Sequence, residues 1–170
     1  MRKICLVHYS SAPGGIEVLM PVIVNRLNNR RFEVFVIRPP ESGRRNVYDG
    51  TGLSVTYGSR SNLIAALKLF IFVRRNKDSV IHGFNTGPFF LLTIRLAGGR
   101  RVVYSVRGTI HYANRMQMIL RKITWYLALS KKYILTANSE YSRDVFQRFL
   151  PVRGVHAEVL YNPVGTSRTR

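Results

Sequence analysis

Residues 3–20, KICLVHYSSAPGGIEVLM, pass from an apolar run through a turn of small residues into a segment with helical spacing. The run ICLVH at 4–8 has the composition of a buried strand, and Gly14 and Gly15 follow it. The apolar residues beyond the glycines share one helical face: Ile16, Leu19, Ile23 and Leu27. The start of the chain therefore predicts a strand, a tight turn and a helix.

The same alternation continues along the chain. Apolar, β-branched runs predict strands at 4–8, 32–37, 53–57, 79–82, 102–106, 133–137 and 157–161. Helical spacing predicts further helices at 63–73, 87–97, 115–130 and 139–149. Ser61 or Asn62 would cap the first of these, and 42–52 is expected to be an irregular loop. Repeated strand–helix–strand units form right-handed crossovers, so we expect a three-layer α/β/α fold with a mainly parallel sheet.

Composition is typical of one folded domain. The chain has 170 residues, of which 46% are hydrophobic, enough to build a core. The one cysteine, Cys5, lies in the first apolar run, where we expect it to be buried; a lone thiol favours a reducing compartment. No secretory signal is visible, and the longest apolar segment, 63–73, is too short to span a membrane and contains Lys68.

The charge is strongly positive. The formal net charge is +19, and residues 79–139 contain nine Lys and Arg but no Asp or Glu. Such a field attracts anionic partners, which include nucleic acid, acidic lipid headgroups and phosphorylated substrates. Composition alone does not choose among them.

The topology predicts where a ligand would bind. In open parallel sheets, ligands bind beyond the carboxyl ends of the strands. The residues expected at that edge are His8 to Gly15, Arg38, Tyr57, His82 to Thr86, Arg107 to Thr109, and Asn138 with Ser139.

The pair Gly14-Gly15 has two interpretations. It is either an ordinary tight turn or a place where backbone amides approach a phosphate at a helix N-terminus. The pattern G-x-G-x-x-G is missing and the second strand ends in Arg38 rather than an acid, which argues against a dinucleotide site. The pattern of a P-loop does not occur either.

Two further strand ends carry candidate side chains. His82, in VIHGFNTGPFF at 80–90, is either a ligand-facing donor or proton carrier, or a hydrogen-bonded histidine at the end of a strand. Arg107, beside Gly108, is either a group that binds phosphate or carboxylate, or a surface arginine in a loop. Both are weak candidates for catalysis.

No metal motif is present in the sequence. The four histidines are scattered without a cysteine cluster: His8, His82, His111 and His156. The aspartates Asp49, Asp78 and Asp144 stand alone, and no G-x-S-x-G occurs. We expect neither a metal nor a bound cofactor.

The segment RMQMILRKITWYLALSKKYIL at 115–135 is long, apolar and basic, and its apolar residues occupy more than one face. It is either a helix docked in an anionic membrane surface or a core helix with solvated charged ends. The acid-free region around it favours the membrane interpretation. The residues expected at the membrane surface are Arg121, Lys122, Trp125, Tyr126, Lys131 and Lys132.

The C-terminal part of the chain resembles a known family. LTANSEYSRDVFQRF at 135–149, followed by VLYNPV at 159–164, resembles the family-4 type of GT-B glycosyltransferases, in which "-NSE-S" opens a helix and "NPV" precedes the second domain. GGIE at 14–17 resembles their glycine loop. IHGFNT at 81–86 and SVRGT at 105–109 are similar to the strand ends that line their cleft.

The resemblance implies one half of a GT-B fold, made of two Rossmann-like domains that face each other across a cleft. Residues 1–164 would be the acceptor-side domain and 165–170 the start of a linker or tail, with the donor-binding domain absent. That second domain carries an E-x7-E motif in the family. The spacing from Glu33 to Glu41 matches it by coincidence, because it runs through a strand and Pro39-Pro40 of the first domain.

The resemblance also assigns residues to a site. The donor-diphosphate loop would be Gly14, Gly15 and Glu17. The cleft would contain Asn85, Thr86, Arg107, Gly108, Asn138 and Ser139. Many relatives carry a histidine near the position of Arg107, so phosphate binding is favoured there over catalysis. Pro21 is unusual in the first helix and implies that this helix starts a turn later.

We therefore predict the N-terminal domain of a glycosyltransferase. The complete enzyme would move a sugar from a nucleotide sugar to a lipid-linked or polysaccharide acceptor, in the cytoplasm at the inner membrane face, and this chain alone would be inactive. The alternative is a basic module that binds nucleic acid or another anionic ligand without catalysis, although no nucleic-acid-binding motif is present. A flavodoxin-like or nucleotide-sugar epimerase domain is disfavoured by the missing dinucleotide fingerprint.

Overall fold

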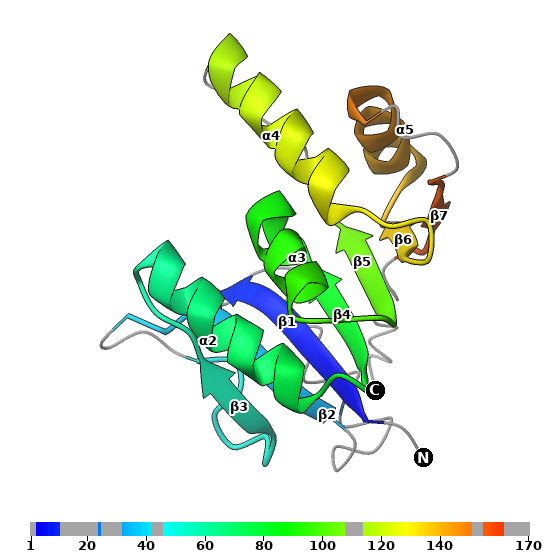
Figure 1. Ribbon diagram of the computed structural model, residues 1–170. Coiled ribbons are helices and arrows are strands. Elements are labelled where there is room, and N and C mark those ends of the chain that lie inside the picture. Colours follow the sequence, from blue (N-terminus) through cyan, green and yellow to red (C-terminus); the bar gives the residue numbers. More distant parts are fainter. Residues whose placement is uncertain are drawn as a thin grey trace, which may run out of the picture.

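A computed structural model of the chain describes residues 3–10, 24, 32–41, 46–107, 114–150 and 155–161. Within them, seven parallel strands form one sheet in the order β3-β2-β1-β4-β5-β6-β7 (Figure 1). The strands are β1 (Ile4–Ser10), β2 (Phe32–Arg38), β3 (Ser54–Tyr57), β4 (Val80–Phe84), β5 (Val102–Val106), β6 (Ile134–Ala137) and β7 (Ala157–Val159). The predicted α/β class with a parallel, Rossmann-like sheet is confirmed.

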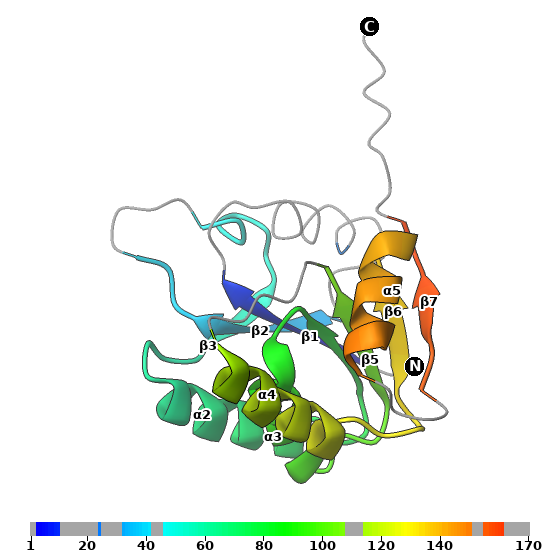
Figure 2. The ribbon, with the colours of Figure 1, turned by 90° about the horizontal axis from the view of Figure 1, so that it is seen from above.

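Four helices belong to the described residues: α2 (Asn62–Arg75), α3 (Gly87–Leu96), α4 (Arg115–Ala128) and α5 (Glu140–Phe149). Helices α2, α3 and α4 lie side by side on one face of the sheet (Figure 2), and α3 contacts both of its neighbours. Side-chain caps start α4 and α5 but not α2, where Ser61 holds the predicted capping position without making a capping hydrogen bond. The side chain of Asn114 accepts a hydrogen bond from the amide of Gln117 at 2.9 Å, and Ser139 does the same for the amide of Ser142 at 3.1 Å.

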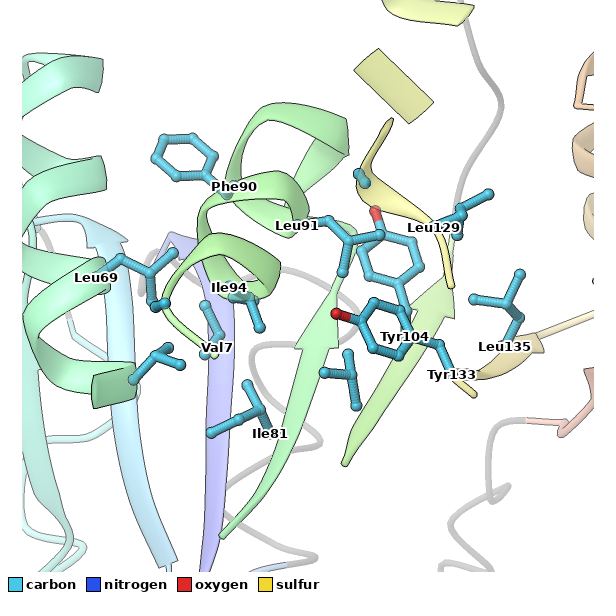
Figure 3. Packing of buried hydrophobic residues seen from close by; sticks show 14 of the residues in the cluster. Val7, Leu69, Ile81, Phe90, Leu91, Ile94, Tyr104, Leu129, Tyr133 and Leu135 are labelled. Carbon is cyan, nitrogen blue, oxygen red and sulfur yellow. The ribbon is translucent and has the colours of Figure 1, made fainter. Parts of the chain in front are cut away.

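The larger part of the core lies between these helices and the sheet. Apolar side chains of β1, β4 and β5 meet those of α2 and α3, for example Val7, Ile81 and Tyr104 with Leu69 and Ile94 (Figure 3). Each of the aliphatic side chains among them is fully buried, which contributes on the order of 1.5–3 kcal/mol apiece. Cys5 belongs to this core as predicted, and its burial raises the pKa of the thiol to about 12.

A smaller core covers the opposite face over β1 and β2. Leu6, Val34 and Val36 point there, because successive residues of a strand alternate between faces. Val24, a helical residue within the predicted first helix, is buried in the same cluster. His8 is also buried on this side and hydrogen-bonds through Nε2 to the hydroxyl of Tyr48, from the β2–β3 connection.

One predicted boundary is wrong in a way that affects the site. The strand expected at 79–82 runs on to Phe84, so His82 lies in the middle of β4 and does not end it. The glycine at 83 had suggested a break, but its backbone pairs with β1 and β5, opposite Val7 and Tyr104. Other boundaries differ by three residues or fewer. Gly14, Gly15, Glu17, Pro21 and Gly108 lie outside the described residues.

No helix in the described part of the chain is both long enough and apolar enough to cross a membrane.

Candidate functional site

A cleft of about 840 Å³ opens at the carboxyl edge of the sheet. The ends of β1 and β4 form its floor, and the first turns of α2 and α3 with the middle of α4 form its walls. Its lining consists of Tyr9, Ser10, Asn62, Leu63, Phe84, Asn85, Thr86, Gly87, Pro88, Phe89, Phe90, Arg121 and Thr124. The volume is within the usual range for small-molecule sites.

The lining combines aromatic rings with small polar groups. Four aromatic side chains lie beside the amides of Asn62 and Asn85 and the hydroxyls of Ser10, Thr86 and Thr124. Amides and hydroxyls both donate and accept hydrogen bonds, as sugar hydroxyls do. Arg121 adds a cation, and no Asp or Glu is among the described lining residues. The cleft therefore suits a neutral or anionic polyol with an apolar face.

The turn between β4 and α3 shapes the centre of the cleft. Asn85 and Gly87 both have positive φ, 48° and 81°, a conformation for which Asn and Gly are favoured. The amide of Gly87 donates to the hydroxyl of buried Tyr104 at 3.1 Å, and the amide of Asn85 donates to the carbonyl of Ser105 at 3.0 Å. These bonds hold the turn against β5, while the exposed Asn85 faces the cleft.

A second hollow of about 240 Å³ continues the cleft toward β2, and the two share Tyr9 and Ser10. Arg38 lines the second hollow and is hydrogen-bonded to two residues that line the cleft. Its Nε donates to the hydroxyl of Tyr9 at 2.8 Å and its Nη2 donates to Oδ1 of Asn62 at 3.0 Å. Because two donors of one planar group are fixed, the guanidinium holds the β1 end and the α2 start in place.

Below the cleft, a polar chain crosses three strands. Nε2 of His82 lies 2.8 Å from Oγ of Ser105, which lies 2.7 Å from Oγ1 of Thr136. The imidazole stacks on the ring of Phe84 with centroids 3.8 Å apart. Burial, and next the positive charge of Arg107, lower the pKa of His82 to about 3, so this histidine is neutral at pH 7.

Arg107 follows β5 on the same side of the sheet as His82. Its guanidinium carbon lies 6.0 Å from the centroid of the Phe84 ring, within range of a cation–π contact. Partial burial lowers its pKa from the ordinary value, although an arginine stays charged at neutral pH. Phe84 lines the cleft and also contacts both His82 and Arg107, which are not among the described lining residues.

The family model for Glycosyltransferase Family 4 matches residues 13–168. The chain belongs to glycosyltransferase family 4. None of the curated proteins matches it.

Solved structures of Anabaena Alr3699/HepE share the fold of this family 4 chain. Those in complex with UDP, with UDP-glucose, and with UDP and glucose give TM-scores of 0.69, 0.70 and 0.69 at 18%, 17% and 16% identity. They cover 94–95% of this chain, which spans only 44–45% of theirs. At such identities the likeness shows the fold, and it agrees with the GT-B assignment made from the sequence.

The structure brings together part of the predicted family 4 site. Of the residues predicted for the cleft, Asn85 and Thr86 line it. Arg107, Asn138 and Ser139 lie at the same edge of the sheet but are not among the described lining residues, and Ser139 caps α5. Gly14, Gly15, Glu17 and Gly108 lie outside the described residues. The roles of all these residues stay predictions.

One of the six residues predicted at the membrane surface is buried, and the other five are exposed or half-buried. Trp125 is wrong as a surface residue: it is 4% exposed and packs edge-on against Tyr104 and Phe146 in the core. Tyr126, the next residue, is 70% exposed. Arg121 reaches the cleft and Lys122 lies 5.2 Å from the ring centroid of Phe149, while the remaining two lysines, Lys131 and Lys132, are exposed beyond α4.

Sequence reasoning missed several cleft residues. Asn62 was assigned only as a possible helix cap, whereas its side chain accepts from Arg38 and lines the cleft. Phe89 and Phe90 sat inside a predicted helix, where aromatic residues normally imply core. An available signal was that the first turn of a helix after a strand end faces the ligand edge in this fold class.

Among the described residues, no three His, Cys, Asp or Glu side chains lie together as a potential metal site. The expectation of no metal is not tested by this observation and stays a prediction.

Proposed function

We propose that this chain is the acceptor-binding half of a glycosyltransferase that moves a sugar from a nucleotide sugar to a lipid-linked or polysaccharide acceptor. The observation that carries the proposal is the cleft at the carboxyl edge, whose aromatic, amide and hydroxyl lining suits a sugar. Membership of glycosyltransferase family 4 supports the reaction class.

The nucleotide sugar would be held mainly by another domain. The chain spans less than half of the structures that it resembles, and those structures hold UDP, UDP-glucose and glucose. In our proposal Gly14 and Gly15 bring backbone amides toward the diphosphate of the donor, and Glu17 fixes this loop. Arg107, at the same edge of the sheet, would bind phosphate.

The transfer would proceed without a metal or other cofactor, with the leaving-group charge stabilised by the glycine loop and basic residues. The positive charge of the chain supports this proposal, because basic side chains can stabilise the charge of a diphosphate leaving group. The reaction would take place in the cytoplasm, peripherally at the inner face of the membrane, where the basic composition favours anionic lipid.

Isothermal titration of the chain tests its half of the reaction. Nucleotide sugars, UDP-glucose first, should give weak or no heat and no turnover, whereas a prenyl-diphosphate-linked monosaccharide or a neutral oligosaccharide should bind. Asn85→Gly removes an amide but keeps a residue suited to the positive φ of the turn, and Phe89→Ala removes a ring; each should weaken acceptor binding by about tenfold, as expected from losing one hydrogen-bonding or stacking group.

A matched control is Tyr57→Phe, since Tyr57 also ends a strand at this edge but does not line the cleft. Its acceptor affinity should equal that of the unmodified chain. Tight UDP-glucose binding with turnover by the chain alone would overturn the assignment to the acceptor side. Equal acceptor binding by all variants would overturn the assignment of the cleft.

A further inference from the structure

Helix α4 carries an apolar stripe that points away from the protein. The stripe consists of Met116, Ile119, Leu120, Ile123, Tyr126 and Leu127, all of which are exposed. They recur at spacings of three and four residues, so they form one face of the helix. The buried residues of α4, Trp125 and Ala128, lie on the opposite side. A surface helix ordinarily turns its apolar face to the core, whereas α4 has apolar residues on both sides.

Helix α2 repeats this arrangement. Its exposed apolar residues are Leu63, Ile64, Leu67 and Ile71, spaced along one face. Its buried residues, among them Ala65, Leu69 and Phe72, occupy the other face. The two stripes therefore belong to the outer surface of the helical layer, on either side of α3 (Figure 2).

The outer surface is also uniformly basic. None of α2, α3 and α4 contains Asp or Glu. Their cations are Lys68, Arg74, Arg75, Arg95, Arg115, Arg121 and Lys122. The exposed surface of the three helices thus combines apolar side chains with cations and carries no acid. A partner that fits it has both apolar groups and negative charge.

We propose that the α2 and α4 stripes dock this protein on an anionic lipid bilayer. Apolar side chains would enter the boundary between headgroups and acyl chains, and the neighbouring cations would bind acidic headgroups. A second copy of the chain is a poorer match, because it would bring its own basic helices to a basic surface.

The cleft opens beside the docking surface. Leu63, the first residue of the α2 stripe, lines the cleft, and so do the exposed Phe89 of α3 and Arg121 of α4. Docking would therefore bring the mouth of the cleft to the headgroups. In this respect the inference rests on the proposed function: of the two acceptor classes, it selects the lipid-linked one, whose sugar lies at the membrane surface.

Flotation with vesicles tests the docking surface. The full 170-residue chain is mixed with vesicles of phosphatidylcholine alone or of phosphatidylcholine with about 30 mol% phosphatidylglycerol. The second kind of vesicle has the negative surface potential of an anionic membrane. We expect binding to the anionic vesicles only. The double variant Ile119→Gln with Ile123→Gln should reduce partitioning at least about tenfold, because two side chains of the inserted stripe become polar.

The matched control changes equally exposed apolar residues elsewhere. Ile134 is 55% exposed and alternates with buried Leu135, so it points to the face without these helices, and Leu160 is 53% exposed beyond β7. Ile134→Gln with Leu160→Gln should bind vesicles like the unmodified chain. Thermal unfolding of both double variants checks that they are folded.

Three results would overturn the proposal: no binding to anionic vesicles, equal binding to neutral ones, or the same loss in the stripe variant and its control. Sedimentation of the chain without lipid tests whether the stripes instead join two copies of the chain. If the unmodified chain and the control are dimers and the stripe variant is a monomer, the stripes are a surface for self-association and the proposal is overturned. The assay contains no sugar. If the chain binds anionic vesicles but no acceptor, the proposed function is wrong and the docking surface stands. If it binds an acceptor but no vesicles, the docking surface is wrong and the proposed function stands.

Discussion

At the scale of single residues, neighbours in sequence have opposite surroundings. Trp125 contacts Tyr104 and Phe146 in the core, whereas Tyr126 is exposed. The sequence offered two large aromatic residues in a basic segment, and both were expected at a membrane. Their separation depends on which side of α4 meets α3 and α5, and this is a tertiary property that local composition does not contain.

Trp125→Ala and Tyr126→Ala should therefore behave differently. The first empties a packed site between two rings and should lower the free energy of unfolding by about 3–5 kcal/mol. The second changes an exposed side chain and should stay within about 0.5 kcal/mol of the unmodified chain. Urea denaturation at pH 7.5 measures both, and equal losses would contradict the packing described here.

Two histidines, the buried His8 and the half-buried His82, make stability depend on pH. Burial lowers the pKa of His8 to about 4 and of His82 to about 3, the latter with the help of Arg107. Between these values and the ordinary pKa of about 6.5, the unfolded chain binds more protons than the folded one, so stability falls as the pH falls. At pH 5.5 each histidine should cost about 1.4 kcal/mol relative to pH 7.5.

His82→Gln isolates one of these contributions. Its amide keeps a hydrogen-bonding partner for Ser105 but does not titrate, so the variant should lose less stability than the unmodified chain between pH 7.5 and 5.5. Ile134→Gln, which places the same amide at an exposed position without removing a titrating group, serves as the control and should keep the original pH dependence. Identical losses for all three proteins would show that folding does not lower the pKa of His82.

At the scale of elements, strand periodicity located every strand that the structure describes, but not where each one stops. β4 continues through Gly83 to Phe84, because backbone pairing with β1 and β5 outweighs the weak strand preference of glycine. This shift moved His82 from the edge of the sheet to its middle. The cleft residues from α2 and α3 follow strand ends directly in the chain, but they were missed because their apolar spacing was interpreted only as the core face of a helix.

The connection from β3 to α2 depends on Gly58. A side chain at this position would collide with the backbone of Ile37, and the amide of Gly58 donates to the carbonyl of Val36 at 2.8 Å. Gly58→Ala should therefore destabilise the protein by about 2–4 kcal/mol through strain in the backbone at the end of β2. Thermal unfolding measures the loss. An unchanged midpoint would show that the connection can move away from β2 without cost.

At the scale of the whole molecule, the order of strands and helices predicted the parallel sheet, since crossover connections allow few other arrangements. The resemblance of residues 135–149 and 159–164 to family 4 likewise agrees with the matched family. The net charge of +19 predicted an anionic partner but not the surface that meets it. That surface became visible only once α2 and α4 were placed on the same face.

The charge predicts a strong salt dependence of vesicle binding. Raising NaCl from about 0.05 M to about 0.5 M shortens the screening length severalfold, and binding to anionic vesicles should fall by about tenfold or more. Duplex DNA of equal charge concentration should compete poorly, because it offers no apolar boundary for the stripes. Efficient competition, with retardation of the DNA in a gel, would favour the nucleic-acid-binding alternative.

The sheet is bounded by two short strands, β3 with four residues and β7 with three. Short edges offer few free backbone groups to a neighbouring molecule, so growth of intermolecular sheets from them is disfavoured. We expect aggregation in concentrated solutions to start instead from the exposed apolar stripes of α2 and α4. A mild detergent, which covers exposed apolar side chains without unfolding the protein, should therefore keep the purified protein dispersed.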